Sequence, residues 1–184
     1  MTTYSGKIVN PLNMKLEDIC IEDIAHALSL VNRFGGHTFY PISVAQHSSY
    51  VRKLVQNEHP RVQLQALLHD GSEAYLGDMV KWVKATEPMR GYRALEETIQ
   101  TLIYERFECP TILHPKVEWA DRVMVRYESV KGYGRHIINH PDYPQLTIEE
   151  IDLVEPWWFQ GPSEAKEDFL YSFDQLVKII GGAE

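Results

Sequence analysis

The spacing of apolar residues constrains the fold of this chain more than any other feature of its sequence. In residues 18–31 the apolar side chains of Ile21, Ile24, Leu28 and Val31 recur every three or four positions, which places them on one face of a helix. Segments with the same period begin at or near Pro41, Pro60, Glu87, Pro115 and Ser163. No segment alternates apolar and polar residues as a half-buried strand does, so the sequence predicts an all-α protein.

Proline and glycine residues set the expected ends of several helices. The segment NRFGGHTFYP at 32–41 contains two glycines and a proline, so we expect it to form a loop. Pro41 is then expected to be the first residue of the next helix, a position that tolerates proline because its missing amide hydrogen has no partner there. The run GYG at 132–134 is expected to end a later helix.

The C-terminal part of the chain is less regular. Residues 135–162 are rich in proline, histidine and aromatics, and we expect a long loop with one short helix, where Thr147 and Glu150 are spaced as a capping box. Ser163 is expected to cap the last helix. No repeat or linker divides the chain, which predicts a single domain over 1–184 with about six or seven helices.

Charge and composition narrow the classes of function. The chain has 26 acidic and 18 basic side chains and a formal net charge of −8. Long nucleic acid is bound mainly through clustered lysines and arginines, so we expect no such partner. No segment approaches the roughly 18 apolar residues of a membrane span, and the N-terminus does not resemble a signal peptide. We therefore expect a cytoplasmic protein without a membrane partner.

The most distinctive motif is the adjacent pair His69–Asp70 at the end of an apolar helical run, ALLHD. An imidazole and a carboxylate together suit a divalent cation such as Co, Mn, Mg, Zn or Fe. His47 lies within a predicted helix beside its inward face, and Asp121 lies at the edge of another apolar face, where a buried carboxylate needs a partner. Each residue also has an ordinary interpretation, as a core or helix-end histidine or as an acid paired with an arginine of its own helix.

The order of these residues resembles the HD-domain phosphohydrolase superfamily. The segment RFGGHTFYPISVAQHS, followed by ALLHDGSEAYLGDMVKWVK and by a predicted helix with WADR, is similar to its nucleotide-hydrolysing branch. That branch includes the bacterial 5′-deoxynucleotidases and related phage enzymes. The resemblance covers roughly residues 20–130 and rests most on HDGSEAYLGD with the upstream RFGGH. It implies an HD-domain helical bundle. The C-terminal part, 135–184, carries no motif of the family, and its own residue pattern predicts a loop and a packing helix.

The resemblance also implies roles for individual residues. The implied metal ligands are His47, His69, Asp70 and Asp121. Among the implied catalytic residues, Glu73 matches the acid that acts on the attacking water, and Asp78 matches a second acid near the sugar and the phosphate. For substrate binding, Arg33 matches a loop arginine that reaches the nucleotide, and Lys84 matches a lysine placed for phosphate. Phe34 stands where bacterial 5′-deoxynucleotidases have a tryptophan near the sugar, so an aromatic ring is kept.

Elementary chemistry agrees with these roles. Glu73 follows His69 by four residues, so on a continuous helix the two would share a face. A divalent metal lowers the pKa of a bound water and neutralises phosphate oxygens, while a nearby acid positions or deprotonates that water. Arg33 is suited to anionic oxygens through its planar fork, and Lys84 as a point charge. Lys84 lies in MVKWVK, which replaces a proline-containing segment of the family.

The sequence therefore predicts an enzyme that hydrolyses (deoxy)nucleotide phosphate bonds by attack of water on the α-phosphorus. Two modes stay open, a 5′-deoxynucleotidase acting on a deoxynucleoside monophosphate and a triphosphohydrolase acting on a deoxynucleoside triphosphate. One alternative is a phosphodiesterase or pyrophosphohydrolase for a signalling nucleotide, and another is a metal-containing nucleotide-binding or sensor domain without catalysis. The presence of all four ligands and Glu73 favours an active enzyme. The resemblance also implies a homodimer or a higher homo-oligomer.

Overall fold

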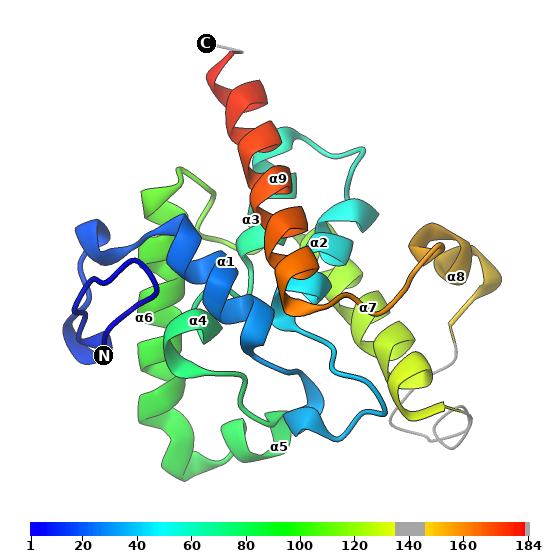
Figure 1. Ribbon diagram of the computed structural model, residues 1–184, viewed down its shortest axis with the longest axis horizontal. Coiled ribbons are helices and arrows are strands. Elements are labelled where there is room, and N and C mark those ends of the chain that lie inside the picture. Colours follow the sequence, from blue (N-terminus) through cyan, green and yellow to red (C-terminus); the bar gives the residue numbers. More distant parts are fainter. Residues whose placement is uncertain (135–145, 183–184) are drawn as a thin grey trace.

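The computed structural model describes residues 1–134 and 146–182 (Figure 1). Apart from two isolated β-bridges, these residues form no β-structure, which confirms the predicted all-α class. The α-helices are α1 (Ile21–Leu30), α2 (Val44–Leu54), α3 (Pro60–Leu68), α4 (Glu73–Leu76), α5 (Lys81–Lys84), α6 (Arg90–Arg106), α7 (Pro115–Tyr133), α8 (Ile148–Val154) and α9 (Pro162–Gly181). The short 3-10 helices are η1 (Pro11–Asn13), η2 (Leu16–Asp18), η3 (Phe34–Gly36) and η4 (Glu87–Met89). Without the four-residue helices α4 and α5, seven α-helices remain among the described residues, which is within the predicted number.

Two expected helix starts are wrong, one because a serine caps the helix after the proline and the other because the helix begins at a proline before the expected serine cap. α2 begins three residues after Pro41, since the hydroxyl of Ser43 accepts a hydrogen bond from the amide of Gln46. α9 begins at Pro162 in the position that tolerates a proline, so Ser163 lies inside the first turn instead of capping it.

Other expected ends agree with the structure. Pro60 is the first residue of α3, and the capping box of Thr147 and Glu150 begins α8. α7 extends to Tyr133, within the GYG run. Part of the predicted loop at 135–162, namely 135–145, lies outside the described residues. No helix among the described residues is both long and apolar enough to cross a membrane.

α2 is the central element of the fold (Figure 1). On one side it packs with α1, α3 and α9 around a buried cluster that includes Leu28, Leu67 and Phe169. On another side it packs with α7 and α8 around a second cluster that includes Met124 and Tyr127. Because α2 is enclosed in this way, nearly every side chain in its first two turns is buried, polar ones included.

The turn that follows α3 is held by close packing against α6. A side chain at Gly71 would meet the Leu68 carbonyl oxygen at 3.0 Å and the Ile103 side chain at 3.1 Å. The side-chain amide of Gln100, also on α6, donates to the same Leu68 carbonyl at 2.8 Å and accepts from the amide of Ser72 at 3.0 Å. α6 therefore fixes the backbone on both sides of His69–Asp70.

Candidate metal centre

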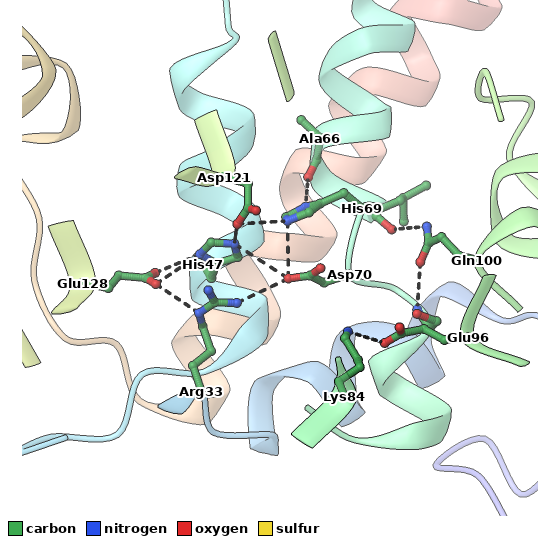
Figure 2. Close-up of polar contacts among 12 residues, drawn as sticks. Arg33, His47, Ala66, His69, Asp70, Lys84, Glu96, Gln100, Asp121 and Glu128 are labelled. Atoms are coloured by element: carbon green, nitrogen blue, oxygen red, sulfur yellow. Dashed lines mark hydrogen bonds and ion pairs between the residues drawn. The ribbon is translucent and has the colours of Figure 1, made fainter. Parts of the chain in front are cut away.

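Three helices bring the four expected ligands together, with side chains that point toward one another (Figure 2). His47 lies in α2, His69 and Asp70 directly follow α3, and Asp121 lies in α7. The His47 Nε2 atom is 3.1 Å from Oδ1 of Asp121 and 3.7 Å from Oδ2 of Asp70. The His69 Nε2 atom is 3.3 Å from the same Asp70 oxygen and 3.8 Å from the same Asp121 oxygen. Residues up to 74 positions apart thus meet at one point.

Each imidazole is oriented through its Nδ1 atom. In His69, Nδ1 donates to the carbonyl of Ala66 at 2.8 Å, and in His47 it donates to the Glu128 carboxylate at 3.1 Å. Both Nε2 atoms are buried and have no hydrogen-bond partner among the described residues. A neutral imidazole whose Nε2 lone pair faces carboxylate oxygens is unfavourable, and a cation bound by that lone pair would remove the repulsion.

The donor set fits a divalent metal ion. His47, His69 and Asp70 each offer one ligand atom, and these atoms lie within 4.8 Å of one another. Asp121 adds a carboxylate oxygen close to both imidazoles. Two imidazole nitrogens with carboxylate oxygens suit a borderline or hard divalent ion of the kind that the sequence suggests.

The charge of each group depends on its neighbours. Burial lowers the pKa of His69, but Asp70 and Asp121 raise it more, to about 9. Burial and the Arg33 charge lower the pKa of His47, while Glu128 and Asp121 raise it, and the net shift is upward. Burial alone raises the pKa of Asp121, yet its contacts with the two histidines hold that pKa well below the usual range. Without a metal, protons on the histidines therefore balance the carboxylates, and a metal ion must displace them.

Glu128 is a residue of the candidate centre that the sequence analysis missed. It is fully buried in α7 and contacts two other groups of the site, Nδ1 of His47 and Nε of Arg33, the latter at 3.0 Å. Its signal was present in the sequence, because Glu128 follows Asp121 by seven residues and therefore lies on the same face of the helix. A carboxylate behind a metal-binding imidazole fixes the ring and its tautomer.

Arg33 is more deeply placed than a loop arginine that reaches out to a ligand. Its side chain is about 10% exposed, and its guanidinium contacts Glu128 and, at 3.3 Å, Oδ2 of Asp70. Burial lowers the pKa of Arg33, but Glu128 and Asp70 raise it above its usual value, so the charge is retained. Arg33 thus links the carboxylate behind His47 to a carboxylate of the ligand set.

Glu73 is close to the centre, although the helix that was expected to carry it does not continue. α3 ends at Leu68, and a tight turn leads to α4, which begins at Glu73. The carboxyl is buried, and its Oε2 atom has no hydrogen-bond partner among the described residues. Burial raises the pKa of Glu73 to about 9, with a further contribution from the negative charges of Asp70 and Asp78.

Asp78 and Lys84 belong to the same electrostatic environment but differ in their contacts. Burial raises the pKa of Asp78, and Arg33 partly offsets that shift. The Lys84 ammonium donates to Glu96 of α6 at 2.8 Å, so in this structure it is already paired with a carboxylate. Burial lowers the pKa of Lys84, but the contact with Glu96 raises it more.

Phe34 lies beside the centre in an uncommon backbone conformation. Its φ is 57°, in the left-handed region that bulky residues rarely adopt. The ring packs edge to face against Tyr133 at 5.6 Å between centroids, and the Arg33 guanidinium lies 5.6 Å from the ring centre. Phe34 therefore supports Arg33 from one side, and the aromatic position expected near the sugar is half-buried.

Two curated proteins are similar to this chain. The uncharacterized protein YfdR of Escherichia coli is 36% identical over 126 residues, which cover 68% of this chain and 68% of that protein. An uncharacterized protein of Rhodobacter capsulatus is 38% identical over 194 residues, which cover 97% of this chain and 95% of that protein. No family model matches the chain. The second alignment spans nearly all of both proteins, so the likeness is not confined to the segments that carry the site.

Proposed function

This chain belongs to one protein family with YfdR and its Rhodobacter capsulatus relative, and we propose that it is a metal-dependent phosphohydrolase of the HD-domain type that acts on a nucleotide. One observation carries the proposal. Two buried imidazoles, each oriented through Nδ1, direct Nε2 atoms that form no hydrogen bond with the described residues at the carboxylates of Asp70 and Asp121, whose oxygens lie 3.1 to 3.8 Å away. A purely structural pair of histidines would satisfy both ring nitrogens.

The residues around this centre supply the parts that phosphoryl transfer to water needs. A divalent ion held by His47, His69, Asp70 and Asp121 would supply positive charge to phosphate oxygens and acidify a nearby water. Glu73 can accept a proton only when ionised, and neutralisation of the Asp70 charge removes one of the repulsions that keep it protonated. Glu128 holds the His47 ring in place, so the centre needs little rearrangement.

The charges near the centre favour a monophosphate over a triphosphate. A triphosphate carries more negative charge and needs more free cations to receive it. Here Lys84 is paired with Glu96, and Arg33 is paired with Glu128 and Asp70. We therefore favour a nucleoside 5′-monophosphate, with the deoxy sugar preferred on the strength of the family resemblance, as the substrate.

Phosphate release from a panel of nucleotides tests the proposal. The purified chain is supplied with Co, Mn or Mg and given deoxynucleoside monophosphates, the matching ribonucleotides and triphosphates, and the products are separated by chromatography. Nucleoside plus inorganic phosphate from a monophosphate is the expected result. Release of nucleoside and intact triphosphate from a nucleoside triphosphate would instead indicate a triphosphohydrolase.

A matched pair of variants separates this chemistry from a contaminating phosphatase. Glu73→Gln should lose about 10²- to 10⁴-fold in turnover while it keeps its metal, because it removes a proton acceptor and no ligand. Glu149→Gln makes the same change at an exposed position of α8 and should leave turnover unchanged. No turnover of any nucleotide by metal-loaded protein would overturn the proposal and favour a sensor or binding role.

A further inference from the structure

Three basic groups face the same oxygen atom of Asp70 (Figure 2). Its Oδ2 atom is 3.3 Å from Nε2 of His69 and 3.7 Å from Nε2 of His47. The third group is the Arg33 guanidinium, whose Nη1 atom donates to the same oxygen at 3.3 Å. Ligand atoms that hold one ion at about 2.0 to 2.2 Å lie about 3 to 3.6 Å apart. Oδ2 is therefore the Asp70 atom best placed to share an ion with the imidazoles.

The guanidinium of Arg33 is fixed in this position. On its other side, Nε donates to Oε2 of Glu128 at 3.0 Å, and Glu128 is fully buried. The backbone of Arg33 is held as well, because its amide donates to the Ile42 carbonyl at 2.8 Å. Arg33 is buried and keeps its charge, so an ion that binds Asp70 must do so beside a permanent positive charge.

The choice of oxygen decides how Arg33 acts on a metal ion. A hydrogen-bond donor supports a metal-binding carboxylate when it binds the oxygen that the metal leaves free. Arg33 instead binds the oxygen that the two imidazoles face, so its N–H and the ion would share one oxygen. Two cations on one oxygen repel each other, and this repulsion is weakly screened because Arg33, His47 and Glu128 are buried.

Glu128 contacts both Arg33 and His47, yet its effect on an ion should have the opposite sign. Its carboxylate accepts from Nδ1 of His47, which leaves Nε2 of that ring to bind a cation. Its negative charge also attracts a cation, and Arg33 partly cancels that charge. The two partners of one buried ion pair are therefore expected to act in opposite directions on metal affinity.

We infer that Arg33 competes with the metal ion for Oδ2 of Asp70, and that this competition weakens metal binding and keeps the ion exchangeable. The inference rests on the proposed metal centre. Without an ion, the guanidinium balances the charges of Asp70 and Glu128 and holds both carboxylates in place. With an ion, the same guanidinium becomes a like charge next to it. Arg33 thus stabilises the empty centre more than the occupied one.

Competition for Co²⁺ with a chelator of known affinity tests this inference on the full-length chain, without substrate. We expect Arg33→Gln to bind Co²⁺ about 10-fold or more tightly than the wild type, because a positive charge is removed while all four ligands stay. Arg33→Lys keeps the charge and should stay close to the wild type. Arg126→Gln is the matched control and should leave the affinity unchanged, since Arg126 lies on α7 but pairs with Glu150 of α8. A gain in affinity separates this role from a structural one, because loss of a supporting contact would weaken metal binding.

A second comparison keeps the test informative if Arg33→Gln folds poorly because Glu128 is left unpaired. Glu128→Gln lacks that buried charge, and so does the double variant that adds Arg33→Gln to it. We expect the double variant to bind Co²⁺ about 10-fold more tightly than Glu128→Gln alone. Equal or weaker binding in both comparisons would overturn the inference and make Arg33 a support for Asp70. Absence of Co²⁺ binding in the wild type and in every variant would overturn the metal centre itself, so the two failures are distinguishable.

Discussion

The metal centre and the neighbouring segment at 73–84 differ in how their charges are arranged. At the centre, acids and bases alternate at close range, so His47 faces Asp121 and Glu128 while Arg33 joins Glu128 to Asp70. In the segment at 73–84, the Glu73 Oε2 atom has no hydrogen-bond partner among the described residues, and the Lys84 ammonium pairs with Glu96 of α6.

This difference indicates that the centre is preorganised, whereas the 73–84 segment would reach its working arrangement only with a metal and a substrate bound. The side chains of the centre are held by three helices and by one another without an ion, which would lower the cost of binding the proposed metal. The groups expected to meet the phosphate are not held in that arrangement, so under the proposed function the metal and the substrate would have to arrange them. Changes in the centre should therefore act on metal binding, and changes in the 73–84 segment on turnover.

Loss of a ligand should have the largest effect. His69→Ala and Asp70→Ala each remove a donor atom from the set within 4.8 Å. We expect metal content to fall well below one ion per chain and turnover to drop by about 10³-fold or more, because several kcal/mol of charge stabilisation are lost. Metal analysis and steady-state kinetics on the same preparations measure both effects. Full metal content in His69→Ala would show that the ion lies elsewhere.

A smaller effect on metal binding is expected from a change at Glu128, which contacts the ligand His47 on the side away from the proposed metal. Glu128→Gln keeps the shape of the side chain but removes the charge that orients His47 and pairs with Arg33. Metal affinity should fall by about 10- to 100-fold, as is typical for the partner of a metal-binding histidine. Competition with a chelator gives the affinity, and Glu150→Gln, which removes an acid paired with Arg126, serves as the control. An unchanged affinity would remove Glu128 from the site.

The smallest effect is a dependence of stability on pH in the metal-free chain. The pKa of His69 is about 9 in the fold, and its ordinary value is 6.5, so its contribution to stability is complete below pH 6.5 and lost as the pH rises through 9. Glu73 acts in the same direction, because its raised pKa means that the fold holds a proton that the unfolded chain releases above pH 4.5. We expect a loss of about 1 to 2 kcal/mol between pH 6.5 and 9, or about 2 to 8 °C in Tm.

Thermal unfolding in EDTA across this pH range measures that loss. Glu73→Gln cannot ionise, so it should be more stable than the wild type near pH 8 and closer to it near pH 5. This variant thus gains stability while it loses turnover, a pairing that an acid used for catalysis in a buried position should show. A Tm that rises steadily from pH 6.5 to 9 in the metal-free wild type would contradict the assigned shifts.

Much of the fold was predictable because helices leave a local signature. The spacing of apolar residues and the capping box at Thr147 each depend on residues a few positions apart. The structure contains the helices that this spacing predicts and the capping box. The starts of α2 and α9 were missed because a proline is compatible with several positions near a helix start. At α2 the Ser43 hydroxyl decides between them.

The site was predictable only in part, since its contacts join distant residues. His69–Asp70 stands out as a motif. The helical period places Glu128 on the face of Asp121, but its contact with His47 follows only from the packing of α7 against α2. The burial of Arg33 was not predictable from its loop, because the acids that hold it come from the end of α3 and from α7. Lys84 was predicted to bind phosphate. Its ion pair with Glu96 could not be predicted from the 73–84 segment, because Glu96 lies on α6.

The long reach of Glu128 also bears on the order of events during folding. Its contact with Arg33 joins residues 95 positions apart, and its contact with His47 joins residues 81 positions apart. Such distant pairs form late, because a long stretch of chain must first be ordered. On the ribosome, the first half of the chain emerges with Asp70 but without Glu128, the second acid that His47 and Arg33 contact. An ion captured early by the proposed centre would therefore meet at most His47, His69 and Asp70, and Asp121 would complete the set when α7 docks.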